Sequence, residues 1–299
     1  MTSSSPSMLA DAPVRSAWER VKLARHPERP HTLDYVAELM TDFVELHGDR
    51  VFGDDRALVG GLAQFAGRTV MVLGHQKGGN TQENLRRNFG MPRPEGYRKA
   101  ERLLRHAEKF GFPVITFIDT PGAEPGIGSE ERGQATAIAE SLLTMASLQT
   151  PIVAVVIGEG GSGGALAIGI ADRIVMLENA VYAVASPEAC AAILWKDAAK
   201  AEQAAETMRI TAADLFRFGI IDDVVPEPAP AHERPRDVMQ AVGEALTRHL
   251  DDLSALVAAS GIEHLLNVRY DKFRRIGSWR ESVATEHGLP PETANGFLG

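Results

Sequence analysis

The feature that most constrains the fold is a strand–loop–helix pattern that occurs twice in the middle of the chain. The first copy runs from FPVITFID through TPGAEPGIGSEERG to QATAIAESLLTMASL, and the second from PIVAVVIG through EGGSGG to ALAIGIAD. Strands that are apolar at every position are typically buried on both faces of a sheet, which requires helices on both sides. The repeat therefore predicts an α/β architecture in which the two units are successive turns.

Hydrophobic spacing predicts the elements on either side of this repeat. Apolar residues at helical intervals predict one helix across Leu33–Arg50, with Gly48 as its C-terminal stop. A short helix is expected from about Gly163 to Ala171, directly after the second glycine loop. The remaining predictions are strands over Ala57–Phe65, Arg68–Gly74 and parts of 173–184, and helices over 97–110, 186–195 (capped by Ser186, with Pro187 at its first position) and 238–257.

Composition excludes several classes of protein. No apolar run approaches the roughly 20 residues of a membrane helix, and the N-terminal stretch MTSSSPSMLADAPVR lacks the features of a signal peptide. The single cysteine, Cys190, excludes an internal disulfide and a cysteine-cluster zinc site, and we expect a core thiol in a cytoplasmic protein. A formal net charge of −9 argues against general nucleic-acid binding.

One segment of this acidic chain is basic. Residues 68–109 hold ten Lys and Arg against four Asp and Glu. Such a segment indicates either a contact with an anionic group, such as a phosphorylated ligand or an acidic partner, or an ordinary solvated helix face. The sequence leaves both interpretations open.

The glycine loop of the second unit fits a dinucleotide-binding motif. Gly158, Gly160 and Gly163 spell G-x-G-x-x-G, and Glu178 lies at the spacing expected of a ribose-binding acid. Two features count against this interpretation, because the helix that follows is short and an equivalent unit precedes it.

The same loop also spells the nucleophile elbow G-x-S-x-G, through Gly160, Ser162 and Gly164. An elbow needs a histidine and an acid as partners. The histidines that follow Ser162 lie in or beyond a Pro-rich segment, in no convincing order with an acid. We expect Ser162 to be a spacer, and a P-loop is excluded because no Lys follows the glycines.

A third interpretation is that the adjacent glycines expose bare backbone amides. Without Cβ atoms, a ligand can approach the backbone closely, and the first amides of a helix are unpaired. Together these features favour an oxyanion hole made without any charged side chain. The alternative is a loop that merely lets a small helix pack tightly against the sheet.

Several long segments together resemble one known family. GHQKG, RRNFGMP.PEGYRKA, ITFIDTPGA.PG.G.EERGQ, VIGEGGSGGALAIG and SPE.CA.ILWK, in this order, resemble the carboxyltransferase alpha subunit of bacterial acetyl-CoA carboxylase. The resemblance runs from about Trp18 to Pro228. Many members carry a longer N-terminal helical extension, whereas here about seventeen residues precede Trp18.

The resemblance implies a crotonase-like α/β fold, a superhelix of repeated ββα units with flanking helices at both termini. Together with the polar N-terminal composition, it predicts a disordered tail at 1–17, a carboxyltransferase domain at 18–258, and a partly irregular C-terminal extension at 259–299.

The family transfers a carboxyl group from carboxybiotin, on a biotin carboxyl carrier protein, to acetyl-CoA, and the malonyl-CoA product serves fatty-acid synthesis. The resemblance implies an α2β2 assembly with a zinc-ribbon beta subunit, which holds the zinc and the acetyl-CoA side. Biotin carboxylase is a further implied partner, and no metal is expected on this chain.

By motif match, Gly163 and Gly164 supply two backbone N–H groups to the ureido oxygen of biotin, and Gly160 and Gly161 shape the turn. The biotin oxygen is then itself the base, which accounts for the lack of a convincing catalytic His or carboxylate pair. Weaker candidates are Gly122 and Gly126 on the biotin side, where a tight turn is the alternative, and Lys77, Arg86, Arg87 and Arg98 as contacts to CoA phosphates or to the carrier protein.

Two other functions remain open. The chain could be the biotin-side subunit of a different acyl-CoA carboxylase or decarboxylase, since the biotin half need not contact the acyl group. It could also be a non-catalytic subunit that only positions a partner.

Overall fold

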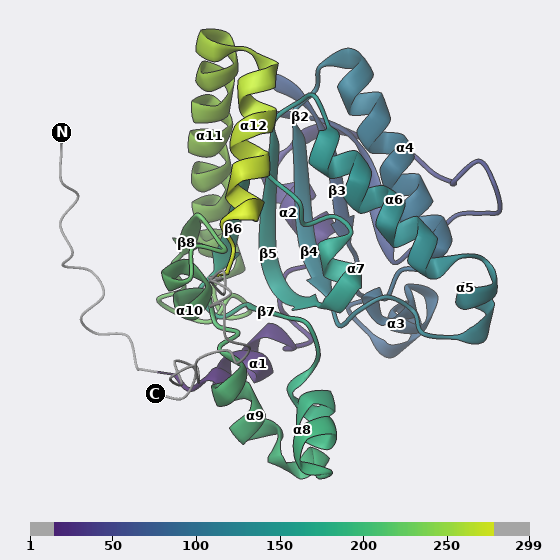
Figure 1. Cartoon of the computed structure of the whole chain (residues 1–299), viewed down its shortest axis with the longest axis vertical. Helices are drawn as coiled ribbons and strands as arrows, with labels where there is room; N and C mark the ends of the chain where they lie inside the picture. Colours follow the sequence, from purple (N-terminus) through teal and green to yellow (C-terminus); the bar gives the residue numbers. More distant parts are fainter. Residues whose placement is uncertain (1–14, 278–299) are drawn as a thin grey trace, which may run out of the picture.

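The computed structural model describes residues 15–277, in which one mixed β-sheet has helices on both faces (Figure 1). The sheet order is β1-β2-β3-β4-β5-β6-β8, and β7 pairs with the end of β5. The pairs β1–β2 and β2–β3 are antiparallel, and all the others are parallel. Nearly all of the expected N-terminal tail and the end of the expected C-terminal extension lie outside the described residues.

The strands are β1 (Thr41–Glu45), β2 (Leu58–Phe65), β3 (Arg68–His75), β4 (Val114–Thr120), β5 (Ile152–Gly161), β6 (Arg173–Leu177), β7 (Val181–Ala183) and β8 (Asp223–Val225). The helices are α1 (Ala17–Ala24), α2 (Thr32–Leu39), α3 (Thr81–Arg86), α4 (Pro94–Phe110), α5 (Ile127–Glu131), α6 (Gln134–Ser147), α7 (Ser162–Leu166), α8 (Pro187–Trp195), α9 (Ala201–Met208), α10 (Ala212–Arg217), α11 (Pro235–Ser260) and α12 (Ile262–Arg274), with short 3₁₀ turns at Asn88–Gly90 and Ala198–Lys200.

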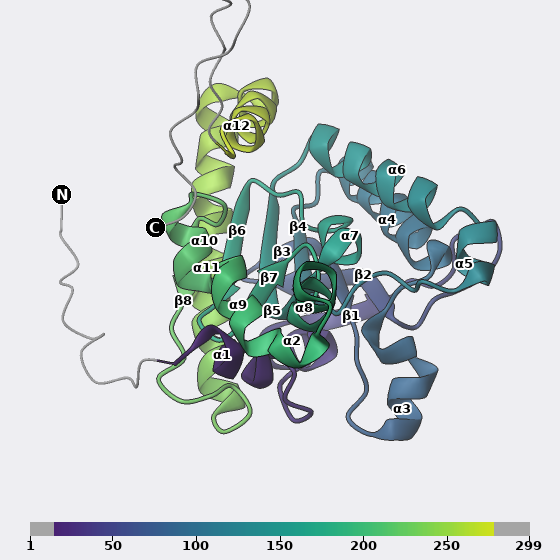
Figure 2. The ribbon, with the colours of Figure 1, turned by 60° about the horizontal axis from the view of Figure 1, so that its bottom comes forward.

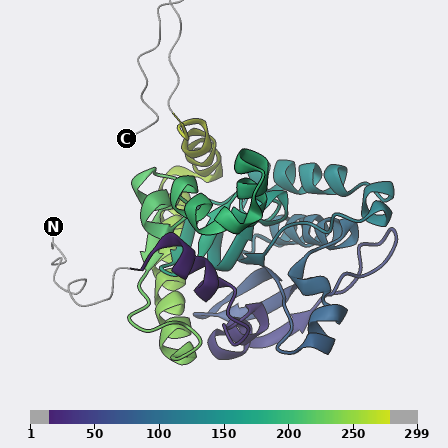
Figure 3. The same ribbon diagram turned by 90° about the horizontal axis from the view of Figure 1, so that it is seen from below.

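The repeat that was found in the sequence forms the centre of the sheet. Every residue of β4, and all of β5 except its last residue, are buried, and the two strands are parallel neighbours. Helices α4 and α6 pack together on one side of the sheet, and α2, which contacts β4 and α11, lies on the other (Figure 3). The carboxyl ends of β4 and β5 therefore bring their two glycine loops to the same edge.

The prediction of a single helix across Leu33–Arg50 is wrong. Helix α2 ends at Leu39, Met40 has extended backbone angles, and the chain continues as strand β1. Asp42 has φ +54°, and the register of β1 against β2 shifts between Thr41 and Val44. Pairing with the open edge of β2 outweighs the helical spacing of the apolar residues, because tertiary hydrogen bonding overrides local propensity.

Two further expectations need correction. The helix expected from about Gly163 to Ala171 is shorter than predicted, because α7 ends at Leu166. The chain then turns, and Gly169 lies close to the hydroxyl group of Tyr182. Cys190 is half-buried on α8 and is not a core thiol. The other predicted strands and helices are confirmed to within a few residues, including the Ser186 cap of α8.

The last helix of the described chain is anchored in the core. Arg269 on α12 is 1% exposed, forms an ion pair of 2.8 Å with Asp172, and donates to the carbonyl oxygens of Met145, Leu148 and Thr150. Helices α8 and α9 form an arm beyond the sheet edge, next to α1 (Figures 1 and 2). None of the helices in residues 15–277 is long and apolar enough to span a membrane.

Candidate functional site

Two glycine loops meet at the carboxyl ends of β4 and β5. A Cβ atom added to Gly161 would lie 2.2 Å from the carbonyl oxygen of Pro121, and one added to Gly164 would lie 2.5 Å from the amide nitrogen of Ala123. Such distances are impossible for a real Cβ atom, so the two backbones touch directly. Gly161 and Gly164 are therefore required by the packing of one loop on the other.

Gly163 differs from these neighbours. A Cβ atom at this position would meet only Ile138, at 3.8 Å, and the residue does not have a left-handed φ. Gly160, by contrast, lies against the ring of Tyr182, 2.5 Å from an added Cβ atom. No contact in the described fold requires a glycine at 163, and the space beside it is open to the close approach of another molecule.

The amides of Gly163 and Gly164 are also free to bind another molecule. Gly163 and Gly164 lie in the first turn of α7, where a helix has no internal acceptors for its N–H groups. Among residues 15–277, no other group accepts a hydrogen bond from either amide. The loop thus offers two adjacent unpaired donors on a backbone that is held in place by the neighbouring loop.

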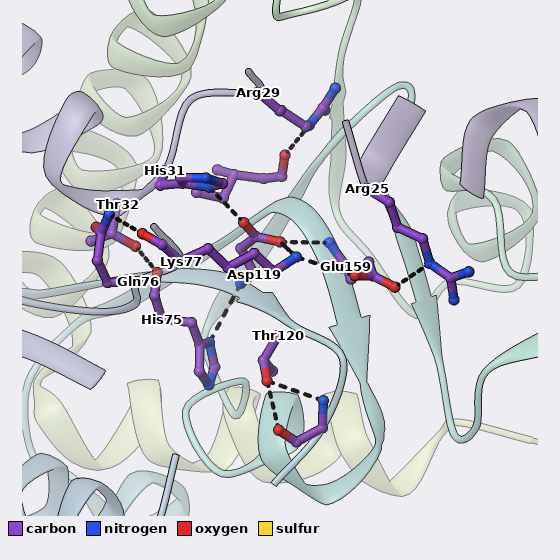
Figure 4. Close-up of polar contacts among 12 residues, drawn as sticks. Arg25, Arg29, His31, Thr32, His75, Gln76, Lys77, Asp119, Thr120 and Glu159 are labelled. Carbon is purple, nitrogen blue, oxygen red and sulfur yellow. Dashed lines mark hydrogen bonds and ion pairs between the residues drawn. The ribbon is translucent and has the colours of Figure 1, made fainter. Parts of the chain in front are cut away.

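In the loop after β4, the amides of Gly122 and Gly126 are occupied. The amide of Gly122 donates to Oγ1 of Thr120 at 3.0 Å, and that hydroxyl donates to the carbonyl oxygen of Gly122 at 2.7 Å (Figure 4). The amide of Gly126 donates to Oε1 of Glu124 at 3.0 Å. Gly122 also has a φ of +152°. These contacts favour a tight strand-to-helix turn at Gly122 and Gly126.

Ser162 occupies the tip of the strand-to-helix junction, as a nucleophile elbow would require. It is exposed and has φ +54°, a backbone conformation that is uncommon for residues other than glycine. Within the described chain, none of the histidine hydrogen bonds involves its hydroxyl. The elbow geometry is present without the base that would activate it, so Ser162 fits its expected role as a spacer.

The dinucleotide interpretation does not fit the structure. Gly158 lies inside β5, where an added Cβ atom would be 2.4 Å from Oδ1 of Asp119. Glu178 pairs with Arg20 at 3.4 Å and accepts a hydrogen bond from the amide of Glu227 at 2.9 Å. The carboxylate of Glu178 therefore tethers α1 and the segment after β8, which accounts for its position in the sequence.

A buried ionic cluster lies behind the two loops (Figure 4). Nζ of Lys77 is 2.6 Å from Asp119 and 3.1 Å from Glu159, the acids near the ends of β4 and β5. Arg25 contacts Glu159 at 2.7 Å, and His31 contacts Asp119 at 3.0 Å. Burial alone would raise the pKa of Asp119, but Lys77 and His31 lower it below its usual range. The cluster joins β4 and the end of β5 to the segment that follows β3.

The four basic residues that the sequence suggested as contacts for phosphates or the carrier do not form one cluster. Lys77 is in the ionic cluster, Arg98 pairs with Asp49 at 2.8 Å, and Arg87 pairs with Glu83 at 3.3 Å. Arg86 is exposed at the end of α3, where it lines a polar hollow with Arg56 and Arg87. Arg86 is thus the most accessible of the four to a phosphate or an acidic partner.

An apolar hollow adjoins the unpaired amides. Its volume is about 330 Å³, and Ser162 and Gly163 form part of its wall beside Leu166, Val184 and Phe273. The hollow can hold a hydrocarbon group next to the two donors. Within residues 15–277, no group of three or more His, Cys, Asp or Glu side chains could hold a metal ion.

Sequence reasoning missed the residues behind the loops. Asp119 and Glu159 each follow an apolar strand in the two copies of the repeat, as in FID and IGE, and this shared position was the available signal. Nothing in the sequence indicated that Lys77 and Arg25 are their partners. His75, buried at the end of β3, was also missed.

Comparison with known proteins gives a consistent set of relatives. The family model of acetyl co-enzyme A carboxylase carboxyltransferase-like proteins matches residues 14–277. The acetyl-coenzyme A carboxylase carboxyl transferase subunit alpha of Halalkalibacterium halodurans is 57% identical over 263 residues, which cover 88% of this chain and 80% of that protein. A Salinispora tropica protein named as subunits beta/alpha of the same enzyme is 58% identical over 268 residues, 89% of this chain and 47% of that protein.

Solved structures show the same architecture at low identity. Transcarboxylase 12S superposes with a TM-score of 0.57 at 21% identity, over 71% of this chain and 42% of that one. The beta subunit of geranyl-CoA carboxylase from P. aeruginosa gives a TM-score of 0.58 at 19% identity, over 80% of this chain and 45% of that one. These likenesses concern the fold, and they confirm the crotonase-like α/β architecture that was expected from the sequence.

Proposed function

The chain belongs to the acetyl-CoA carboxylase carboxyltransferase family as an alpha subunit, and from this premise we propose that its glycine loop stabilises the biotin oxygen during carboxyl transfer. The reaction of the family moves a carboxyl group to acetyl-CoA and gives malonyl-CoA. Carboxybiotin, when bound, supplies that carboxyl group together with a ureido oxygen that becomes negatively charged and basic. The roles of this chain's own residues follow from their contacts.

The observation that carries the proposal is the pair of unpaired amides on Gly163 and Gly164. Two fixed, un-ionised donors suit an oxygen on which charge develops, because they need no reorganisation during the reaction. Each such donor is typically worth about 3–4 kcal/mol to a transition state. The space around Gly163 and the apolar hollow beside it support the approach of a group with a polar end and a hydrocarbon body.

The surrounding residues position this pair and take no part in proton transfer. Gly160 and Gly161 let β5 pass close to Tyr182 and Pro121. Gly122 and Gly126 shape the supporting loop and keep their amides engaged within it. A contact of Arg86 or Arg87 with CoA phosphates or with the carrier protein remains a weaker part of the proposal, and the ion pairs of Lys77 and Arg98 make these two residues less accessible.

We propose that the active enzyme is an assembly with a zinc-ribbon beta subunit, in an α2β2 complex served by a biotin carboxyl carrier protein and by biotin carboxylase. The beta/alpha name of the Salinispora tropica relative supports the partnership, since this chain matches about half of that protein. Zinc would lie on the beta subunit. A cytoplasmic location agrees with the single cysteine of the chain and with this metabolic role.

The test is reconstitution. The purified chain is mixed with a beta subunit, and the biotin-dependent decarboxylation of malonyl-CoA is followed. We expect no turnover from the chain alone and robust turnover from the mixture. Turnover by the isolated chain would rule out a shared active site. Parallel assays with propionyl-CoA and acetyl-CoA as carboxyl acceptors distinguish the acetyl-CoA enzyme from a carboxylase of another acyl-CoA.

A further inference from the structure

His75 contacts the glycine loop from inside the protein. It is the last residue of β3, its side chain is fully buried, and its Nε2 lies 3.2 Å from the carbonyl oxygen of Gly164. On the other side of the ring, the amide nitrogen of Asp119 lies 3.4 Å from Nδ1 (Figure 4). The imidazole therefore connects the ends of three neighbouring elements, β3, β4 and α7.

These two contacts assign the tautomer of the ring, which also has the backbone of Phe117 as a neighbour. A backbone amide can only donate, so Nδ1 of His75 must accept the hydrogen bond from Asp119. A carbonyl oxygen can only accept, so Nε2 must carry the proton that is donated to Gly164. The ring is thus neutral, with its proton on Nε2. Burial lowers the pKa of His75 to about 4, since the nearby carboxylate of Asp119 only partly offsets the loss of solvation, so this form persists at physiological pH.

Within residues 15–277, the carbonyl oxygen of Gly164 accepts no hydrogen bond from the backbone. Helix α7 is so short that the amides after it bond elsewhere: that of Ala167 reaches Gly163, and that of Ile168 reaches Ala165. In the described part of the chain, His75 is the only donor to the carbonyl oxygen of Gly164. This bond sets the orientation of the peptide group that follows Gly164, and with it the backbone angles at Gly164 that aim its amide.

We propose that His75 is a positioning residue for carboxyl transfer, which keeps the Gly164 amide aligned with the oxygen that the loop stabilises. The inference rests on the proposed function of the loop. His75 does not touch the reacting group and does not transfer a proton. It acts through the carbonyl of Gly164, so its effect belongs to the reaction step and not to the binding of the CoA substrate.

The test compares two variants of nearly equal size in the complete complex with the beta subunit. His75→Leu removes both ring nitrogens, whereas His75→Gln keeps an N–H donor near the position of Nε2. We expect His75→Leu to lower kcat by about 10- to 100-fold. This decrease is no larger than the decrease in kcat caused by removing a whole oxyanion donor. The KM for malonyl-CoA should stay within about twofold, and His75→Gln should recover most of the loss.

Thermal unfolding separates positioning from packing. If both variants melt at lowered temperatures but only His75→Leu loses kcat, the positioning role stands. Equal losses of kcat in both variants, or full kcat in His75→Leu, would overturn it. Failure of the wild-type complex to turn over would instead reject the proposed function.

A measurement without turnover keeps the inference testable in that case. In ¹⁵N-labelled chain, the His75 signals, assigned by their absence in His75→Gln, should report a neutral ring protonated on Nε2 from pH 8 down to about pH 5. A ring protonated on Nδ1, or one that titrates near its ordinary pKa of about 6.5, would contradict the geometry on which the inference depends.

Discussion

Gly164 packs so closely against Ala123 that a Cβ atom on the glycine would lie 2.5 Å from the alanine amide nitrogen. The preceding residue, Gly163, has no such neighbour, since an added Cβ atom would meet only Ile138 at 3.8 Å. Two adjacent glycines are therefore present for different physical reasons. One is required by the fold and the other is free to serve a ligand, and substitutions at the two positions should separate these requirements.

Gly163→Ala should keep the fold and lose the reaction. The free energy of unfolding should change by less than about 1 kcal/mol, because alanine fits the space and favours a helical position. Turnover of the complex should fall by about 100-fold or more, because the methyl group keeps the oxygen away from the two amides and so weakens the oxyanion bonds. Steady-state decarboxylation and thermal melting measure the two effects. Gly53→Ala, also in open space, is the matched control and should leave both unchanged. Undiminished turnover in Gly163→Ala would place the oxyanion site elsewhere.

Gly164→Ala should destabilise the chain. The added methyl group would collide with the backbone of Gly122 and Ala123, and the loop cannot yield as a flexible side chain could. Overpacking of this kind costs about 1–3 kcal/mol. Urea unfolding of the isolated chain measures the loss without involving the partner. A variant as stable as the wild type would show that the two loops can separate at little cost.

Lys77→Met should be strongly destabilising, because it leaves Asp119 and Glu159 without their shared cation. Breaking a buried ion pair by removing one partner typically costs about 3–5 kcal/mol. The double variant Lys77→Met with Asp119→Asn should recover part of this loss, since one of the stranded charges is then removed. Denaturant unfolding of the two variants forms the comparison. If the double variant is no more stable than Lys77→Met, the negative charge left uncompensated by the loss of Lys77 is not the cause.

Asp49 should contribute stability that depends on pH. Burial would raise the pKa of its carboxyl group, but hydrogen bonds from the amides of Val51, Phe52 and Gly53 and from Arg98 lower the pKa to about 2. Because the folded pKa lies below the unfolded value of 3.8, the stabilisation is fully present above about pH 5 and is lost as the pH falls toward 2. The linkage amounts to about 2 kcal/mol.

The matched variant for this prediction is Asp49→Asn, which keeps an oxygen acceptor and removes the charge. Stability curves from pH 7 to pH 3 should show wild type and variant converging in acid, with the larger gap at neutral pH. A gap that is constant across this range would mean that the carboxylate charge is not the stabilising element.

Much of the fold could be predicted from the sequence because its central strands are apolar at every position. β4 and β5 lie next to each other as the repeat indicated, and the helices after them cover the sheet. The prediction of one helix from Leu33 to Arg50 was wrong for a definite physical reason. Its apolar spacing suits a helix, but β1 is determined by hydrogen bonds to β2, and the sequence of the segment itself does not record that partner.

The candidate site shows the same division. Gly163 and Gly164 could be chosen from the glycine pattern and the family resemblance, whereas the division of labour between them depends on what lies opposite each Cα atom. The ionic cluster joins Lys77 to Asp119 and Glu159, which are 42 and 82 residues away in sequence. Glu178 has the sequence spacing of a ribose-binding acid, but its carboxylate contacts Arg20 and Glu227. Contacts between distant segments are set by the topology of the sheet, and no local pattern encodes them.

The five residues of α7 limit how this loop can recognise its target. A long helix accumulates aligned peptide dipoles, whose field attracts any nearby anion whatever its shape. The short helix α7 produces little of this long-range field. Attraction at the loop therefore comes from the hydrogen bonds of two amides, and hydrogen bonds weaken steeply when donor and acceptor are misaligned. Inorganic phosphate or sulfate in solution should therefore compete poorly at this loop. Selectivity then depends on the angle and the distance at which a group tethered to a carrier reaches the two amides. The loop needs no closing segment to keep free anions out.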